Sequence, residues 1–238
     1  MKQTTKILLA ITGALALAVV LLTVWARLSV GGILESGRSD EEAVELSGSR
    51  VERSFEVGSF SRIEVKGGWE VDVRAGNPAA VSVTADEALM DELTVEASGG
   101  TLTLGSESWN FGRDARLSAE ITVPSLDAVS VSGGVDGTIS GFSGSSLALD
   151  ISGAADIDGT DNSYERLNVT VEGAADVDFA DSRAVNAEVR LDGAGNIELT
   201  MAGGELTGRI GGVGSVTYGG EVSREAVAVE GVGSVERR

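Results

Sequence analysis

The sequence predicts an all-β protein folded as a parallel β-helix, a β-solenoid with coils of about 20 residues, preceded by one N-terminal transmembrane helix. Three observations support this prediction. A glycine-containing cassette recurs at a fixed period, apolar and polar residues alternate as in strands, and no helical periodicity is sustained after the first 30 residues. The chain has 238 residues, two prolines and no cysteine. This length accommodates one solenoid domain and a tether.

The cassette occurs six times in the second half of the chain and places Asp, Asn or Ser three residues after a glycine. The glycines are separated by 20, 20, 20, 19 and 19 residues. Such a period is typical of one supersecondary unit stacked on copies of itself. We expect each glycine to lie at a coil corner and to supply the positive φ that a tight corner needs. The six glycines are Gly133, Gly153, Gly173, Gly193, Gly212 and Gly231.

Alternation with a period of two begins near residue 51 and continues to the last cassette. It indicates strands whose alternate side chains face a core. In the repeat region, equivalent apolar residues recur from coil to coil, so we expect them to stack inward as continuous columns. One column contains Leu147, Leu167, Ala187, Leu206 and, in the last coil, Glu225; a second contains Ile157, Val177, Ile197, Val216 and Val235.

The two ends of the predicted solenoid differ. Residues 55–104 alternate but fit the period poorly, so we expect them to cap one end, with a brief helical turn within Asp86 to Glu92. No further segment follows the last cassette, so the strands at the other end are expected to be exposed edges. Exposed solenoid ends would allow the chain to form a homo-oligomer.

The N-terminal residues are of a different kind. Two lysines precede an apolar run from Ile7 to Ala26, and twenty such residues in a helix span a bilayer core of about 30 Å. Basic residues are scarce just after the run, which favours an N-terminus inside the cell. We expect residues 1–30 to be a membrane anchor, with a cleaved signal peptide as the alternative. Residues 31–51 would be a polar linker, and residues 52–238 a periplasmic or extracellular domain of a single-pass cell-membrane protein.

Composition excludes several classes of function. The formal net charge is −19, and a surface of this sign repels phosphate backbones, so nucleic-acid binding is excluded. It would attract cations or basic partners instead. The chain has no His and no Cys. Ser-His-Asp and Cys-His catalysis and His- or Cys-based metal sites are therefore excluded, and any enzyme chemistry would need carboxylates alone.

Several segments together resemble a known family. They are FSRIEVKGGWEVDV, VSVTADEALMDELTVEASGGTLTL, ITVPSLDAVSVSG and the serial cassettes. They resemble the bacterial GIN domain, which is labelled "putative auto-transporter adhesin head domain" and is a domain of unknown function. The resemblance covers about residues 52–238 and implies a right-handed β-helix in the cell envelope, with no established site residues. The chain departs from the family pattern at Asn196, Ser215 and Ser234, where Asp is replaced.

The cassette acids are the main candidate site. Asp136, Asp156 and Asp176 are equivalent, and Asp158 and Asp178 follow two residues later on the same face if the strands are regular. Carboxylates stacked about 4.8 Å apart repel one another, so they either bind a cation or have a raised pKa. Calcium is the natural candidate, and no other cofactor is expected. The alternative is that each Asp, Asn or Ser hydrogen-bonds the backbone of its own turn.

Aromatic residues offer a second candidate site. Trp69 is in phase with Val71 and Val73, so we expect it in the core. Trp109 and Phe111 lie in a polar, loop-like segment and are candidates for a contact surface.

These features predict a non-catalytic binding or structural module of the cell envelope, similar to an adhesin head, whose partner is an envelope protein or glycan. The alternative is a carbohydrate-processing enzyme, since retaining glycosidases need two carboxylates about 5–5.5 Å apart and Asp156 and Asp176 would lie on adjacent coils. This alternative is fold-level analogy. No Lys or Arg lies within residues 117–165 to bind an anionic sugar, and the short coils leave no room for cleft-building loops.

Overall fold

The structure is a computed structural model that describes residues 46–106 and 116–238. The predicted membrane anchor, most of the linker, and the aromatic pair Trp109 and Phe111 lie outside these ranges. Within the described residues, no helix is long and apolar enough to cross a membrane. The anchor, its orientation and the right-handed winding of the coils stay predictions.

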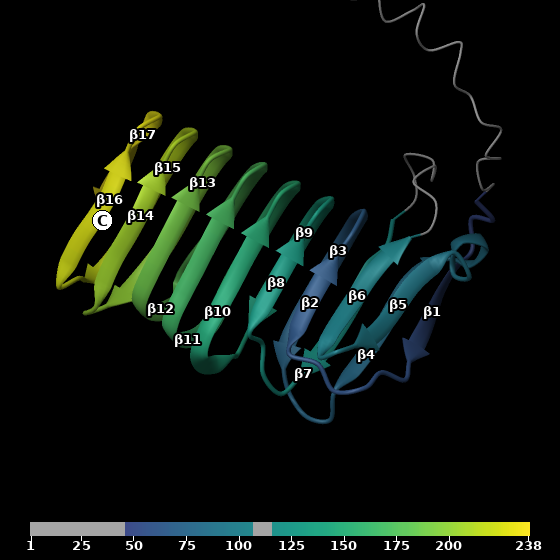
Figure 1. The fold of residues 1–238 in the computed structure, drawn as a ribbon. Coiled ribbons are helices and arrows are strands. Elements are labelled where there is room, and N and C mark those ends of the chain that lie inside the picture. The colour runs from purple at the N-terminus through teal and green to yellow at the C-terminus, as the bar shows by residue number, and fades with distance from the viewer. Residues whose placement is uncertain (1–45, 107–115) are drawn as a thin grey trace, which may run out of the picture. The chain divides into compact units, whose positions relative to one another are not determined.

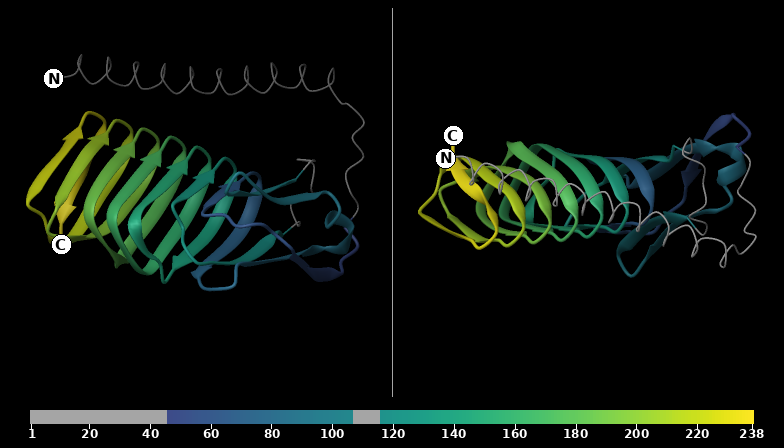
Figure 2. Two further views of the ribbon diagram at one scale, coloured as in Figure 1. Left: turned by 60° about the horizontal axis from the view of Figure 1, so that its bottom comes forward. Right: turned by 90° about the horizontal axis from the view of Figure 1, so that it is seen from above.

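Parallel strands stacked in register form the predicted solenoid. One continuous sheet winds into two facing layers, and successive coils lie side by side in a row (Figures 1 and 2). The repeat region contains β8 (Ala128–Val131), β9 (Gly134–Ser140), β10 (Ser143–Ile151), β11 (Ala154–Val171), β12 (Ala174–Leu191), β13 (Ala194–Ala202), β14 (Glu205–Ile210), β15 (Val213–Glu221), β16 (Arg224–Val229) and β17 (Val232–Arg237).

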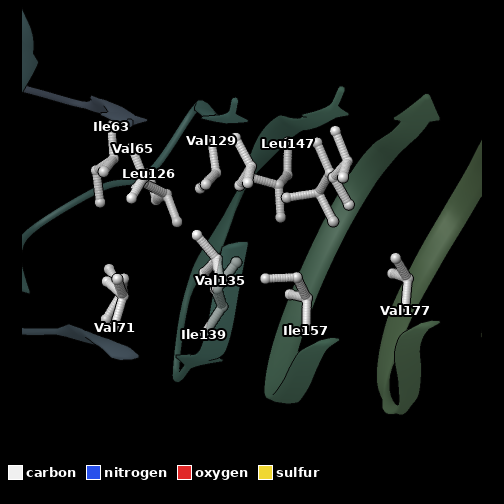
Figure 3. Close-up of a cluster of buried hydrophobic side chains, with 14 of the residues drawn as sticks. Ile63, Val65, Val71, Leu126, Val129, Val135, Ile139, Leu147, Ile157 and Val177 are labelled. Carbon is white, nitrogen blue, oxygen red and sulfur yellow. The ribbon is translucent and has the colours of Figure 1, made fainter. Parts of the chain in front are cut away.

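The pairing of residues confirms the predicted columns. Leu147 pairs with Leu167 at an offset of 20 residues, and Ile197 pairs with Val216 at an offset of 19. The inward side chains of these columns are buried in one continuous core until the last coil, where Glu225 is exposed. Figure 3 shows two facing rows of such side chains, with Ile63, Val65, Val129 and Leu147 opposite Val71, Val135, Ile157 and Val177.

A buried polar corner links the two layers in the earlier coils. Asn162 is 3% exposed and lies where β11 bends. Its Nδ2 donates to the carbonyl oxygen of Ile139 at 2.8 Å and to Oγ of Ser182 at 3.0 Å, and its Oδ1 accepts from the backbone N–H of Phe142 at 3.0 Å. These bonds satisfy the buried amide and connect three successive coils.

The later coils replace this polar corner with glycine, which explains the change of period from 20 to 19. The strand there is interrupted at Gly203 and Gly204, between β13 and β14. Gly203 has a φ of 99°, and a Cβ on Gly204 would lie 2.3 Å from the carbonyl oxygen of Val185. A corner made of glycine turns more tightly, so the coil closes with one residue fewer.

The cassette glycines do lie at a corner, but the predicted reason for glycine is wrong. None of the six has a positive φ. Instead, the corner backbone presses against the preceding coil: a Cβ on Gly173 would lie 1.8 Å from the carbonyl oxygen of Gly153. That oxygen also accepts a hydrogen bond of 2.9 Å from the backbone N–H of Ala174. Glycine is required because backbone contact between coils leaves no space for a side chain.

The predicted cap is smaller than residues 55–104. Strands β2 and β3 form a coil that pairs in parallel with β8 and β9, and strands β6 and β7 form a further coil beyond it. Only β1, β4 and β5 are antiparallel and cover this end, with β1 on β4, β4 on β7, and β5 on β6. The elements are β1 (Arg50–Phe55), β2 (Arg62–Val65), β3 (Gly68–Ala75), β4 (Ala80–Asp86), η1 (Glu87–Leu89), β5 (Leu93–Ser98), β6 (Thr101–Ser106) and β7 (Ser118–Val123).

The brief helical turn is confirmed as η1, and Asp86 is its N-cap. Asp86 Oδ1 accepts from the N–H of Ala88 at 3.0 Å, and Oδ2 accepts from the N–H of Gly48 at 2.8 Å. Burial acts to raise the pKa of this carboxyl, but hydrogen bonds from Ser47, Ala88 and Gly48 outweigh burial and lower it. The ionised Asp86 therefore ties the residues before β1 to the cap.

Candidate functional site

Three cassette acids lie side by side on the outer face of the solenoid, as predicted. Asp156 pairs with Asp136 on β9 and with Asp176 on β12, and all three side chains are exposed. Neighbouring strands lie about 4.8 Å apart, so these carboxylates follow one another from coil to coil. Asp136, Asp156 and Asp176 form the acid column.

A second acidic column runs parallel to the first. Asp158 pairs with Asp178, and Asp178 pairs with Glu198 on β13. These residues follow the acid column by two positions in regular strand, so both columns share the outer face, as predicted.

The structure extends both columns to acids that sequence reasoning missed. Glu70 on β3 pairs with Asp136, and Asp72 pairs with Glu120 on β7. The missed signal is that Gly67 precedes Glu70 by three residues, as in the cassettes. The distance of 66 residues between Glu70 and Asp136 hid this relation, because β4 to β7 interrupt the period.

A shallow, open groove of about 670 Å³ runs beside the acid column. It crosses β9, β11, β12 and β13, and its floor is made of small residues because Gly or Ala stands two positions before each cassette acid or Asn196. Trp69 lies at the β9 end of this acid-lined groove. The lining residues are Trp69, Gly134, Val135, Asp136, Ala154, Ala155, Asp156, Ala174, Ala175, Asp176, Ala194, Gly195 and Asn196.

Trp69 is a core residue, as predicted, that also borders the groove. Its side chain is 4% exposed, and Nε1 donates to the carbonyl oxygen of Lys66 at 3.1 Å. The indole N–H is therefore satisfied inside the protein, and the ring offers the groove only its edge of contact.

The acid column raises the pKa of its central member. Asp156 loses hydration at its position between two strands, and the charges of Asp158, Asp136 and Asp176 add like-charge repulsion. Both effects disfavour the ionised carboxylate, so the pKa of Asp156 is raised above its ordinary value. The column therefore carries unfavourable charge at neutral pH, which a positively charged group would relieve.

Neutral residues end the column and supply hydrogen-bond donors. Asn196 Nδ2 and the Asn196 backbone N–H donate to Oδ1 of Asp176, at 2.9 and 3.0 Å. Ser215 Oγ donates in turn to Oδ1 of Asn196 at 2.8 Å. The alternative prediction, that each side chain bonds the backbone of its own turn, is wrong for Asp176, because these bonds cross to the next coil. An ionised carboxylate can only accept, so Asn and Ser connect where a further Asp would repel.

Metal binding at the five predicted residues stays a prediction. Among residues 46–106 and 116–238, no group of three or more His, Cys, Asp or Glu side chains is placed to hold a metal ion. Calcium takes six to eight oxygen ligands, whereas Asp136, Asp156, Asp158, Asp176 and Asp178 are spread along an open sheet face.

Fold and groove together define a class of protein: an acidic β-solenoid that presents a groove lined by carboxylates and small residues along its coils. The chain belongs to the family described as "Putative auto-transporter adhesin, head GIN domain", whose profile matches residues 59–222. This match confirms the resemblance recognised in the sequence. The family description refers to an adhesin head and to no enzymatic activity.

Solved structures with similar folds carry related descriptions. A "putative adhesin" from Bacteroides fragilis is 19% identical and has a TM-score of 0.66 over 81% of this chain and 98% of that chain. A "putative adhesin" from Parabacteroides merdae is 16% identical, with a TM-score of 0.47 over 81% of this chain and 97% of that chain. At this identity the first structure supports the fold alone. No curated protein matches the chain significantly.

Proposed function

We propose that this protein is a non-catalytic binding module of the cell envelope, held at the membrane by its N-terminal apolar stretch and displayed outside the cytoplasm. The acid-lined groove is the contact surface. The observation that carries this proposal is the groove itself, which combines a floor of small residues with a regular column of carboxylates. The family description as an adhesin head supports it.

The groove suits an extended partner with positive charge. Its lining repeats from β9 to β13, so a linear segment along the coils would meet equivalent positions at steps of about 4.8 Å. Repulsion within the acid column would decrease when a cationic group approaches, so the column favours such a partner. A basic segment of an envelope protein or an amino-sugar glycan has this chemistry.

The test is binding of the full chain, held in neutral detergent, to purified envelope proteins and to an array of envelope glycans. The triple variant Asp136→Asn, Asp156→Asn, Asp176→Asn should bind at least about tenfold more weakly, a change of about 1.4 kcal/mol. The matched control is Asp150→Asn, Glu165→Gln, Asp181→Asn, which removes the same charge from exposed positions outside the groove. Equal loss in both variants would assign the effect to net charge and refute the groove as the contact surface.

The same variants address the carbohydrate enzyme. If the full chain cleaves an envelope glycan and Asp176→Asn abolishes the cleavage, the protein is an enzyme and the proposal is wrong. Cleavage that is absent or unchanged in the Asp176→Asn variant leaves Asp176 without a catalytic role.

A further inference from the structure

The last coil exposes backbone groups that every earlier coil has paired. In a parallel sheet, alternate residues of a strand direct their N–H and C=O groups to opposite neighbours. The backbone N–H groups of Glu230, Val232 and Arg238 donate to the preceding coil, at 2.9, 2.9 and 3.0 Å. The alternate residues therefore direct their groups the other way, and no described strand lies beyond β16 and β17 to receive them.

The residues that face outward along the solenoid axis are also the inward positions of the core. They continue the buried columns of β14 and β15 but are only partly covered. Val229 is 45% exposed, in contrast to its buried partner Ile210. These edge positions are Glu225, Val227 and Val229 on β16 and Gly233, Val235 and Arg237 on β17.

Charge and apolar surface at this end favour association. Residues 224–238 contain three basic and three acidic side chains, so the last coil is neutral in a chain of net charge −19. Of the exposed large hydrophobic side chains among the described residues, Val213, Val229 and Val232 lie in the last two coils. The repulsion expected between two acidic chains is therefore weakest here, where apolar surface is most exposed.

The two edges stand in a defined register within the coil. The Oη of Tyr218 donates to Oε2 of Glu225 at 2.7 Å, and Tyr218 pairs with Arg237 on the adjacent coil. Glu225 and Arg237 therefore lie at about the same height on opposite layers. Counting in steps of two toward the turn at Glu230 and Gly231 places Val227 opposite Val235, and Val229 opposite Gly233.

We propose that two copies of this chain associate end to end through the last coil, with β16 of each copy paired antiparallel with β17 of the other. A twofold axis parallel to these strands exchanges the two layers and keeps every residue at its height. The edge groups of both copies then face one another in the phase that antiparallel pairing requires. Figures 1 and 2 show β16 and β17 as the final coil, at the end opposite β1, β4 and β5.

The side chains match in this arrangement. Glu225 of one copy lies opposite Arg237 of the other, Val227 opposite Val235, and Val229 opposite Gly233. An opposite-charge pair and a valine pair each stabilise a cross-strand contact. The pairs occur twice by symmetry, and the apolar corner of one copy covers the apolar corner of the other. The dimer would thus continue both the sheet and the core.

The other antiparallel arrangement fits less well. If β16 paired with its own copy and Val227 lay on the twofold axis, Glu225 would face Val229 of the second copy. That arrangement buries a carboxylate against an aliphatic side chain without an opposite charge, which is costly. The distribution of charge along the two strands therefore selects pairing of β16 with β17.

Sedimentation equilibrium of the full chain in neutral detergent tests the proposal. We expect a reversible monomer–dimer equilibrium in the wild type. The Glu225→Arg variant and the Arg237→Glu variant should each associate at least about tenfold more weakly, because like charges then face one another. An equimolar mixture of the two variants should restore dimers, since each variant presents the charge that the other lacks. The control Glu96→Arg, on the exposed face of β5 at the other end, should dimerise as the wild type does.

Cysteine cross-linking tests the register, and the chain has no native cysteine to interfere. A mixture of the Val227→Cys and Val235→Cys variants should form a disulfide-linked heterodimer under mild oxidation. Each variant alone should remain uncross-linked. Self-cross-linking of Val227→Cys would show pairing of β16 with itself and overturn the proposed register. A wild-type chain that stays monomeric at about 100 μM, well above a Kd typical of weak specific interfaces, would overturn the dimer and leave this edge for a partner of another sequence.

Discussion

The coils built from β10 to β12 and those built from β13 to β17 share one core but differ in everything that surrounds it. The earlier coils have 20 residues, a buried Asn162 corner and cassettes that end in Asp. The later coils have 19 residues, a glycine corner and cassettes that end in Asn or Ser. The inward columns stay in register through both regions. Stacking of aliphatic side chains therefore sets the fold, while outer positions are free to carry charge, which concentrates beside the groove.

The largest effect should come from the glycine corner that both regions share. Gly173→Ala would place a methyl group 1.8 Å from the carbonyl oxygen of Gly153. The backbone would have to separate two hydrogen-bonded coils, so we expect a loss of about 3 kcal/mol or more in the free energy of unfolding. Gly212→Ala, with a distance of 1.8 Å to Gly193, should behave in the same way in the later region. Thermal unfolding followed by circular dichroism measures both.

Gly134→Ala is the matched control for these variants. It stands next to a cassette glycine, has no neighbouring atom within 4 Å of the new Cβ, and corresponds to an alanine in β11, β12 and β13. We expect a change within about 0.5 kcal/mol. If Gly134→Ala and Gly173→Ala were equally stable, close backbone approach would not be the reason for the glycine period.

A second effect should separate the two regions. Asn162→Ala leaves the Phe142 N–H and the Ile139 carbonyl without their side-chain partner, and we expect a loss of about 2 kcal/mol. Asn168→Ala, six residues later on the same strand and half-buried, is the control and should cost less than about 0.5 kcal/mol. Chemical denaturation of both variants measures the difference. Equal losses would mean that the polar corner contributes no more than an ordinary surface asparagine.

A smaller effect of opposite sign is expected in the acid column. The pKa of Asp156 is raised in the folded protein, so its ionised form costs stability above that pKa, and the cost disappears as the pH falls below the ordinary value of 3.8. Asp156→Asn should therefore stabilise the protein at pH 7 by about 0.5 kcal/mol, reduced by salt because the side chain is exposed. The gain should vanish near about pH 3. Melting temperatures at several pH values provide the measurement.

Asn196→Asp extends the same column into the later region and should do the reverse. It removes the amide that donates to Asp176 and adds a like charge, so we expect lower stability at pH 7. A stabilising Asn196→Asp, or an Asp156→Asn gain that persists at low pH, would show that repulsion does not govern this column.

The smallest effect is expected from calcium. The acids of the earlier coils lie along an open face and do not converge, so millimolar calcium should screen their repulsion only weakly and raise the melting temperature by less than about 2 °C. Differential scanning calorimetry with magnesium as the control is suitable. A large rise that is specific to calcium and is lost in Asp156→Asn would establish the predicted cation site.

Much of the fold and part of the site could be predicted. The six cassettes predicted the pairing of Asp156 with Asp136 and Asp176, because in-register parallel coils bring residues one period apart into contact. Trp69 was predicted in the core from its phase with Val71. The reason for the corner glycines was not accessible, since a close approach between coils has the same sequence signature as a positive φ. The groove also could not be foreseen, because its concavity depends on how the backbone bends at the corner.

By itself, the sequence determined the period, the strand phase, the inward columns and the family, since each depends only on residues repeating at a constant spacing. The tertiary structure decided the order of the first coils. Strands β2 and β3 lie between β6–β7 and β8–β9, although β6 and β7 come later in the chain. This insertion brings Glu70 beside Asp136 and makes a small antiparallel cap. No local pattern encodes it, because the chain leaves the stack at β4 and returns at β6, and only long-range pairing specifies where it returns.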